Sequence, residues 1–453
     1  MSIPDLNSSS NLYKKIIFSV EPRSYRYVLV LFFKLTNITE LAVGGSATDQ
    51  VLGSGVTDNP VIKMPTLVYY SNNNNRVEEI VPYIPGSTIK GLLRSIAEKH
   101  VAMMDKNNKR KLIDVLMKLI ELDEQSKTGY LDKHDVSEIV DKILAKILNQ
   151  YLDEKIVNKI CNSIREYNNF KEFIKLVKKA SETSWSSDLG KALEEIVSDE
   201  EINELMNNIA PIIITILNNY EISPDVCNPV IEGLMCELPI PKYKLLLLNA
   251  LSETINKNIT YPCRICKLFG LPGYMSRLIV TDAWPLGVKK TILLLRTHIA
   301  IDRLRESVVS GKTFDIEYIA PGAEFGFIII YHLATQKDIE KIDQNNDGTL
   351  DKLIETIKKA SNKTDEENLD LLKKIIENIE TNGVWIGKRK TWGMGKVEIK
   401  LEATALIDLS KQTDPSHNPL ILGKNPNEII SQYIKQGIPL PLKNTLQIFF
   451  PTT

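Results

Sequence analysis

The stretch VPYIPGSTIKGLLR, residues 81–94, brings together residue types that bind anions. A Pro-Gly-Ser turn ends an apolar run and opens an amphipathic helix, whose first turn carries free backbone N–H groups and the positive end of the helix dipole. Gly86 would let a phosphate approach the backbone, and Ser87 can cap the helix or contact the anion. Lys90 and Arg94 are four residues apart and share one helix face. The alternative is an ordinary strand–turn–helix junction with surface cations.

A second stretch, IGKRKTWGMGKVEIK at residues 386–400, holds five cations, one acid, three glycines and a tryptophan. Glycines allow a phosphate close to the backbone, the cations supply charge, and a tryptophan can stack on a base. The candidate contacts are Lys388, Arg389, Lys390, Trp392, Gly393 and Gly395. The spacing matches neither a Walker A loop nor a GxGxxG motif. The residues therefore indicate a nucleic-acid contact, and a plain charged hairpin is the alternative.

Four of the five cysteines have the residue type and approximate spacing of a zinc site. YPCRICKLFG, residues 261–270, contains a CxxC pair, which is half of a tetrahedral site, and a looser pair lies upstream. The four candidate ligands are Cys227, Cys236, Cys263 and Cys266. The residues that could replace one of them are Cys161, His100 and His134. Buried cysteines without a metal are the other interpretation, and a thioredoxin-type redox pair is disfavoured because no βαβ context surrounds it.

The stretch DQNNDGTLDKLIE, residues 343–355, begins like a calcium-binding EF-hand loop but lacks its last ligand. Position twelve must be a bidentate glutamate; here it is Ile354, and Glu355 comes one residue late. We therefore expect a polar turn that caps the next helix. No serine-hydrolase or zinc-protease signature appears, and nothing in the scattered histidines supports a catalytic triad.

The whole chain sets limits on these local patterns. Its 453 residues are enough for two or three domain-sized pieces, and its net charge of −1 means that any anion site must be a local patch. The polar N-terminal stretch has no apolar core of a signal peptide, and no apolar run reaches bilayer length. Five cysteines do not make a disulfide framework in so long a chain. We expect a soluble, cytoplasmic protein with no membrane partner.

The elements that must position these motifs suggest an α+β core interrupted by helices. YRYVLVLFFKLTNI, residues 25–38, predicts a central strand, and residues 43–66 read as a long loop of the kind that often carries function. Helical periodicity dominates from about 101 to 220, and strand character returns near 277. The expected parts are 1–100 (start of the core), 101–260 (helical insertion ending near the CxxC), 261–334 (core strands and a hairpin), 335–382 (second helical insertion) and 383–453 (last core strands with the glycine-rich loop).

Taken in chain order, these motifs resemble those of the RAMP superfamily of CRISPR-associated proteins. PYIPGSTIKGLLR is similar to the family's IPGSSLKGxxR signature, CRICKLFG and SRLIVTDAWPL to its C-x-x-C-x-LFG and SRL…D segments, and GKRKTWGMGKVEI to its C-terminal glycine-rich loop. Residues 298–327 resemble the segment that carries the family's β-hairpin thumb. The resemblance covers about residues 40–100 and 260–405 and leaves out the helical segment at 101–250.

The resemblance implies a ferredoxin-like (RRM-like) palm with an antiparallel sheet, repeated along a guide RNA, with a thumb that interrupts the guide–target duplex at regular intervals. GSGVTDNPVIK, residues 53–63, is similar to the loop of type III effector backbone subunits whose aspartate helps to cleave target RNA; that residue here is Asp58. RNA can be cut by its own 2′-hydroxyl, so Asp58 would hold a divalent cation (Mg²⁺ or Mn²⁺) or take a proton. An Asx-turn role without chemistry, and Asp49 as the acid, are the alternatives.

The expected function is thus that of a metal-dependent endoribonuclease subunit in a type III CRISPR complex. Its partners would be the CRISPR guide RNA, the target RNA and the other subunits of the effector complex. Guide binding would ignore base sequence, because base pairing reads the sequence in RNA-guided systems while the protein holds the backbone. One alternative is a non-catalytic RAMP subunit that caps or extends the complex. Another is a zinc-stabilised interaction protein with no RNA role.

Overall fold

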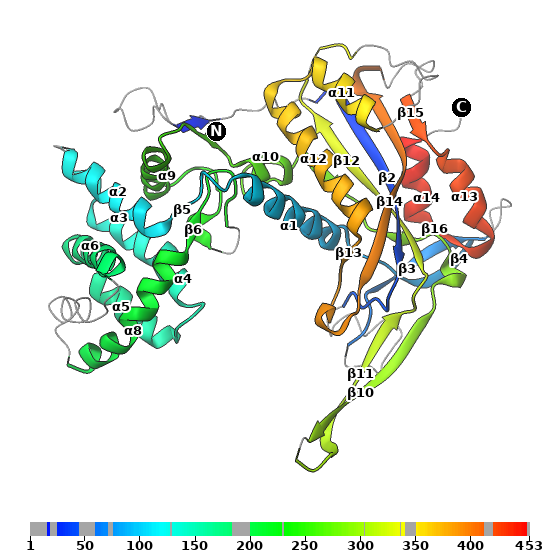
Figure 1. Cartoon of the computed structure of the whole chain (residues 1–453). Coiled ribbons are helices and arrows are strands. Elements are labelled where there is room, and N and C mark those ends of the chain that lie inside the picture. The colour runs from blue at the N-terminus through cyan, green and yellow to red at the C-terminus, as the bar shows by residue number, and fades with distance from the viewer. Residues whose placement is uncertain are drawn as a thin grey trace. The chain divides into compact units, whose positions relative to one another are not determined.

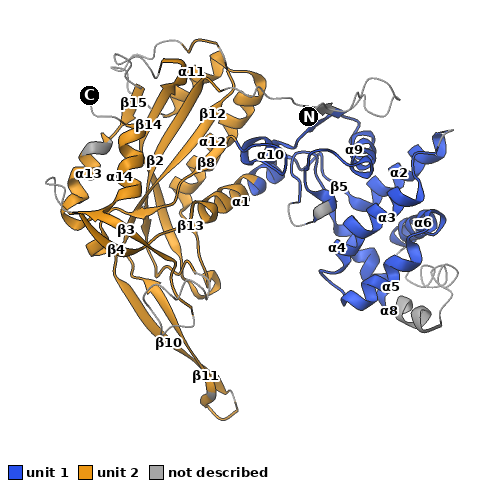
Figure 2. Cartoon of the chain, turned by 180° about the vertical axis from the view of Figure 1, so that it is seen from behind, with its two compact units in different colours: residues 1–20, 98–276 blue, residues 21–97, 277–453 orange. Residues whose placement is uncertain are grey.

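The chain forms two compact units (Figure 2). Unit 1 comprises residues 1–20 and 98–276, and unit 2 comprises residues 21–97 and 277–453. The computed structural model describes residues 16–18, 25–44, 59–70, 76–126, 129–183, 200–228, 231–302, 304–335, 337–339, 350–411 and 420–450. The CxxC stretch therefore belongs to unit 1, and the two stretches predicted to bind anions, residues 81–94 and 386–400, lie in unit 2.

An antiparallel sheet in the order β13-β14-β2-β12-β8 forms the centre of unit 2 (Figure 1). Its strands and the two helices between them are β2 (Tyr27–Asn37), α1 (Gly86–Met104), β8 (Leu278–Val280), β12 (Glu324–Leu333), α12 (Lys363–Asn382) and β14 (Lys396–Asp408). Read in chain order, these elements give βαββαβ, the order of a ferredoxin-like fold. The apolar run at 25–38 supplies the central strand β2, as its composition predicts. The segment 335–382, which the sequence suggested as an insertion, contributes the second core helix.

Different helices cover the two faces of this sheet. Phe32 of β2 belongs to a buried apolar cluster that also includes residues of α13 (Pro426–Tyr433) and α14 (Leu440–Phe449). Tyr331 of β12 faces the other side, where its hydroxyl donates to the Asp365 carboxylate of α12 at 2.9 Å. Successive side chains of a strand point to opposite faces of the sheet. A continuous apolar run, as in β2 and β12, therefore supplies apolar side chains to both faces, and helices cover both.

Smaller elements complete unit 2. A second sheet has the order β16-β3-β4, while β9 and β15 pair with β12 and β14 at their edges. The bounds are β3 (Lys63–Tyr69), β4 (Arg76–Pro82), β9 (Trp284–Pro285), α11 (Leu350–Ala360), β13 (Val384–Trp385), β15 (Leu420–Gly423) and β16 (Ile438–Pro439).

A two-stranded antiparallel hairpin, β10 (Leu293–Asp302) and β11 (Ser307–Ile319), projects from the rest of unit 2 (Figure 1). It overlaps the segment 298–327 expected to carry a hairpin, but it begins earlier, at Leu293, and ends earlier, at Ile319; the last residues of the expected segment belong to β12 (Glu324–Leu333). Its outer end carries exposed apolar side chains, including Leu304, which is 96% exposed. Exposed apolar residues at a hairpin tip are typical of a surface that contacts another molecule.

Unit 1 is mainly helical, as the periodicity after residue 101 predicts. Its elements are β1 (Ile16–Phe18), β5 (Arg110–Lys111), α2 (Leu112–Gln125), α3 (Lys133–Ile139), a π-helical turn (Val140–Leu144), α4 (Ala145–Leu148), α5 (Glu154–Ile164), α6 (Tyr167–Thr183), α8 (Glu200–Asn219), β6 (Glu221–Ile222), α9 (Lys242–Ile255), β7 (Ile259–Tyr261) and α10 (Arg264–Phe269). Helix α2 packs against both α6 and α9 through its apolar face. In the described parts of both units, no helix is long and apolar enough to span a membrane.

Candidate nucleic-acid interface and candidate metal centre

The N-terminus of α1 already holds a carboxylate from the protein itself. The helix begins at Gly86, whose N–H donates to Oδ1 of Asp282 at 2.7 Å. Gly86 is buried, and a Cβ at this position would lie 2.3 Å from the carbonyl oxygen of Val280. Close packing against the segment after β8 thus requires glycine here. The IPGS motif and the SRLIVTD motif are distant in sequence but are in direct contact here. We call this contact of Gly86 with Val280 and Asp282 the α1 joint.

The hydroxyl and cations of α1 follow this joint along the helix. Ser87 is exposed and lies inside the first turn, one residue after the helix begins. Lys90 and Arg94 are both partly buried. Burial lowers the pKa of Lys90, and the nearby positive charge of Arg94 lowers it further. An anion bound beside the two cations would offset their mutual repulsion, which fits the predicted phosphate contact.

The glycine-rich loop is fixed to the short segment that follows β2 (Tyr27–Asn37). The N–H of Lys388 donates to the carbonyl of Ala42 at 2.8 Å, and the N–H of Gly395 donates to the carbonyl of Glu40 at 2.8 Å. A Cβ at Gly395 would lie 1.9 Å from a backbone oxygen, so this glycine is needed for the fold of the loop. Gly393 differs, because nothing lies within 4 Å of the position of its Cβ. Its open backbone is accessible to a ligand.

Aromatic and cationic side chains gather where this loop meets the middle of the β10–β11 hairpin. The guanidinium of Arg389 lies 4.2 Å from the ring centre of Trp392 and 4.8 Å from that of Phe314. His298 stacks on Phe314 with ring centres 5.4 Å apart, and its ring is also 5.4 Å from Trp392. The indole of Trp392 is 55% exposed. We call His298, Phe314, Arg389 and Trp392 the aromatic platform; it offers a supported ring face on which a base can stack.

Sequence reasoning did not find the two hairpin members of the platform. The signal available was that His298 and Phe314 fall on the two strands of a hairpin whose register brings them opposite each other. Burial lowers the pKa of His298, and the charges of Arg389 and Arg296 lower it further. His298 is therefore uncharged at neutral pH, and its ring also contacts the hydroxyl of Tyr318.

The ends of the segment that contains Asp58 lie beside the same loop and hairpin. Asp58 and Asp49 themselves lie outside the described residues. Asn59 pairs with Ile316 of β11, and its carbonyl accepts from the N–H of Glu317 at 3.2 Å. At the other end, Gly44 pairs with Val61.

Two further contacts hold these ends in place. The carboxylate of Glu317 accepts from the N–H of Val61 at 3.0 Å and from the ammonium of Lys63 at 2.7 Å. The side chain of Lys388 lies over Gly44, where a Cβ would meet its Cε at 2.1 Å. The tertiary structure thus brings three predicted motifs together: the loop ends at 44 and 59, the glycine-rich loop and the thumb.

The four predicted cysteines gather in unit 1, all of them buried. Their sulfur atoms all lie within 4.8 Å of one another, and the sulfurs of Cys227 and Cys266 are 3.3 Å apart. Tetrahedral zinc with four sulfur ligands requires sulfurs separated by about 3.8 Å. Cys263 lies at the cap of α10 and Cys266 within its first turn. The fifth cysteine, Cys161, is buried in α5 and is not part of this group.

Hydrogen bonds among the four thiols and their burial shift their pKa values in opposite directions. Hydrogen bonds from the other three cysteines lower the pKa of the Cys227 thiol, whereas sharing a proton with Cys227 raises the pKa of Cys236, Cys263 and Cys266, and burial raises each further. Several buried thiols therefore compete to keep their protons when no cation is present. A zinc ion would allow all four to ionise, and the donor set and spacing fit it.

A profile of the RAMP superfamily matches residues 71–398, which include α1, the four cysteines, the β10–β11 hairpin and most of the glycine-rich stretch. The chain belongs to the RAMP superfamily. No curated protein matches the chain. Among solved structures, one chain of the "Cryo-EM structure of the Type III-B Cmr-beta bound to cognate target RNA" is similar over 84% of this chain, with 11% identity and a TM-score of 0.28. This chain spans 61% of the length of that chain.

The calcium-loop resemblance has no support in the described part of this RAMP protein. Residues 340–349 lie outside the described residues, and α11 begins at Leu350. Ile354, at the position where a calcium ligand would be needed, is buried in the apolar face of α11. The side chain at that position therefore serves packing.

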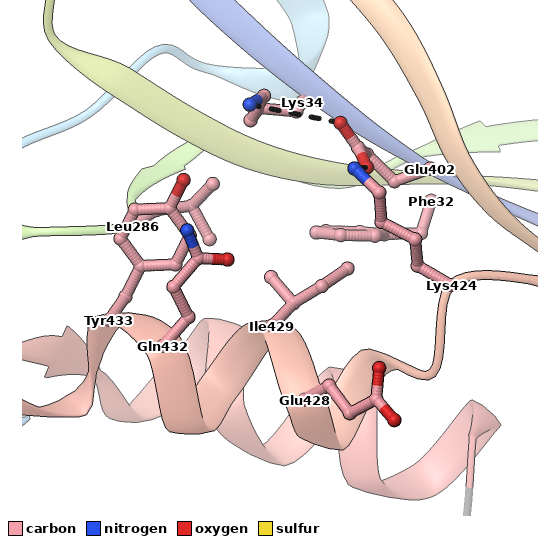
Figure 3. Close-up of a pocket in the computed structure, with 9 residues that line it drawn as sticks. All are labelled: Phe32, Lys34, Leu286, Glu402, Lys424, Glu428, Ile429, Gln432 and Tyr433. Atoms are coloured by element: carbon pink, nitrogen blue, oxygen red, sulfur yellow. Dashed lines mark hydrogen bonds and ion pairs between the residues drawn. The ribbon is translucent and has the colours of Figure 1, made fainter.

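A hollow between the sheet and α13 of the RAMP protein has a volume of about 150 Å³ (Figure 3). It is lined by Phe32, Lys34, Leu286, Glu402, Lys424, Glu428, Ile429, Gln432 and Tyr433. Lys34 lies 3.8 Å from Glu402 and 3.1 Å from Glu324, and Lys424 also pairs with Glu402. Because carboxylates of the protein already neutralise both lysines, this hollow does not have the charge of a phosphate site.

Proposed function

We propose that this RAMP protein is a backbone subunit of a type III CRISPR effector complex that holds the guide RNA and cleaves bound target RNA at regular intervals. The observation that carries this proposal is the meeting of three segments: the glycine-rich basic loop, the β10–β11 hairpin and both ends of the segment that contains Asp58. An RNA strand held by the first two would pass beside the third.

The guide RNA would be bound through its backbone. Lys388 and Lys390 are exposed cations on the glycine-rich loop and are suited to phosphate contacts, with Gly393 as the open backbone position. Trp392 would stack on a base, and Arg389 would support its ring from behind rather than reach a phosphate. On α1 the contacts would be Ser87, Lys90 and Arg94. Gly86 would fix the start of the helix through its hydrogen bond to Asp282 and so orient these three side chains. None of these contacts depends on base identity.

Cleavage would use the chemistry that distinguishes RNA from DNA. The 2′-hydroxyl oxygen attacks the adjacent phosphorus and its proton passes to the carboxylate of Asp58. The bond from phosphorus to the 5′-oxygen of the next nucleotide breaks, and that oxygen takes a proton from water as it leaves. The products are a cyclic 2′,3′-phosphate and a 5′-hydroxyl. A divalent cation such as Mg²⁺ or Mn²⁺ held by Asp58 would offset the negative charge that builds on the phosphate. Glu317, which fixes Val61 and Lys63, would position the segment after Asp58.

Zinc would have a structural role in unit 1. Held by Cys227, Cys236, Cys263 and Cys266, it would join the segment before α9 to the segment around α10. Four protein ligands leave no open coordination position, which is typical of structural rather than catalytic zinc.

The test compares Asp58→Ala with Asp49→Ala in complexes assembled on a guide RNA with a labelled complementary target. We expect Asp58→Ala to abolish target cleavage while guide binding stays normal, because the binding residues lie elsewhere. Asp49→Ala should cleave like the wild type. Unchanged cleavage by Asp58→Ala would favour the non-catalytic RAMP subunit. Purified wild-type protein that carries zinc but binds no RNA would favour the interaction protein instead.

A further inference from the structure

Lys244 is buried beside the four-cysteine cluster and has an unusual environment for a lysine. Only 5% of the residue is exposed, and its ammonium donates to the carbonyl of Gly233 at 2.9 Å. Within the described part of the chain it forms no ion pair with a carboxylate, whereas Lys242, two residues earlier on α9, lies 2.6 Å from Asp135. A buried ammonium with a single backbone partner is costly unless negative charge lies nearby.

The groups around Lys244 that can carry negative charge are mainly the cysteines of the cluster, together with Glu237. Burial lowers the pKa of Lys244, while charge on Cys236, Cys227, Glu237 and Cys263 acts in the opposite direction. Three of these four neighbours are the candidate metal ligands. Once zinc ionises these thiols, the Lys244 ammonium would lie in a buried environment that carries net negative charge, and each would stabilise the other's charged form.

A zinc ion does not remove the need for this compensation. Four thiolates carry roughly twice the charge that one divalent ion neutralises, so the loaded centre stays negative in a buried place. Lys267 is also buried and follows Cys266 on α10. Lys244 comes from a separate helix, α9, and its ammonium is bonded to Gly233, which lies between Cys227 and Cys236 in the sequence.

Gly233 is held from both sides, which makes this contact specific. A Cβ on Gly233 would lie 2.6 Å from the side chain of Ile143 in the π-helical turn. The segment from 231 to 236 is thus packed against that turn on one side and tied to Lys244 on the other. A shift of this segment would move the sulfur of Cys236, one of the four candidate ligands.

We propose that Lys244 is the charge-balancing and positioning residue of the four-cysteine centre, and that its buried ammonium is needed for tight zinc binding. This inference rests on the proposed zinc site. Residues outside the ligand shell that orient ligands or balance their charge commonly change metal affinity by about 10- to 100-fold.

The experiment measures zinc affinity of the full-length chain by competition with a chromogenic chelator. Lys244→Gln removes the charge but retains an N–H donor, Lys244→Arg keeps the charge, and Lys242→Gln on the same helix is the exposed control. We expect Lys244→Gln to bind zinc about 10- to 100-fold more weakly. Lys244→Arg should stay closer to the wild type than Lys244→Gln, and Lys242→Gln should match the wild type.

A second arm separates charge from hydrogen bonding. Cys266→His replaces a thiolate by a neutral ligand and so lowers the negative charge of the centre. In that background Lys244→Gln should cost much less zinc affinity, and the visible spectrum of the cobalt-loaded protein reports the ligand set of each variant. An equal loss in both backgrounds contradicts the charge role, because loss of the Gly233 contact alone would act equally in both.

The outcomes distinguish this inference from the zinc site on which it rests. A wild-type chain that binds no zinc overturns both the site and the inference. A wild-type chain that binds zinc, with unchanged affinity in Lys244→Gln, overturns the inference alone. If circular dichroism finds the Lys244→Gln chain unfolded at every zinc concentration, Lys244 serves the fold and not the metal, which also contradicts the inference.

Discussion

Trp392→Ala is expected to weaken binding of single-stranded RNA by about 5- to 150-fold at a fixed salt concentration. Trp392 is 55% exposed, and the Arg389 guanidinium lies 4.2 Å from the centre of its ring. The guanidinium therefore fixes the ring in place and leaves it accessible to a base. Stacking of one base on an aromatic side chain contributes about 1–3 kcal/mol. A tenfold change in affinity corresponds to about 1.4 kcal/mol, which gives the expected range.

The assay is fluorescence anisotropy of a labelled RNA titrated with the full-length protein at several salt concentrations. Trp392→Ala should lower affinity at every salt concentration without changing the dependence on salt, because no phosphate contact is lost. Lys388→Ala should instead reduce the slope of log affinity against log salt by about 0.7, the value for one phosphate contact to a single strand. Trp392→Phe should retain most of the affinity, since a ring remains.

Trp385→Ala is the matched control for this experiment. Trp385 lies on β13, is 40% exposed and is not part of the aromatic platform. Wild-type affinity of Trp392→Ala, or an equal loss in Trp385→Ala, would refute the platform. A change of salt slope in Trp392→Ala would also contradict it, because stacking releases no counterions.

Two further predictions concern stability. Asp365→Ala should lower the free energy of unfolding by about 3–5 kcal/mol in urea titrations, because it leaves the buried Arg277 guanidinium without its carboxylate, whereas the exposed control Asp370→Ala should change it by no more than about 0.5 kcal/mol. Glu124, paired with two lysines of α6, has a pKa lowered from 4.5 to about 2 by these hydrogen bonds, so it stabilises the fold above pH 4.5. Urea titrations should find Glu124→Gln less stable than the wild type at pH 7, a difference that shrinks from pH 4.5 to 2; a constant difference would contradict this assignment.

The joint at the start of α1 illustrates where sequence reasoning ends. The Pro-Gly-Ser turn predicted a helix start, and α1 does begin at Gly86. The anion at that helix N-terminus is the carboxylate of Asp282, 196 residues further along the chain. Residue spacing could indicate that a negative group was favoured there, but only the packed structure could supply its identity.

The sequence alone determined the features that depend on local residue order. Apolar runs predicted the central strand β2, periodicity predicted the helices of unit 1, and the cysteine pairs predicted four ligands whose sulfurs do gather within 4.8 Å. These follow from backbone propensity, burial of apolar side chains and ligand chemistry, which act over a few residues or through a recognisable residue type.

Only the tertiary structure decided which distant side chains share a site. His298 and Phe314 lie beside Arg389 and Trp392 because the glycine-rich loop packs against the β10–β11 hairpin. The Lys244 ammonium lies near the cysteines because it binds the carbonyl of Gly233, in the segment between Cys227 and Cys236. Such contacts depend on how sheets and helices pack, and each is set by the sum of many small burial and shape terms that no short motif encodes.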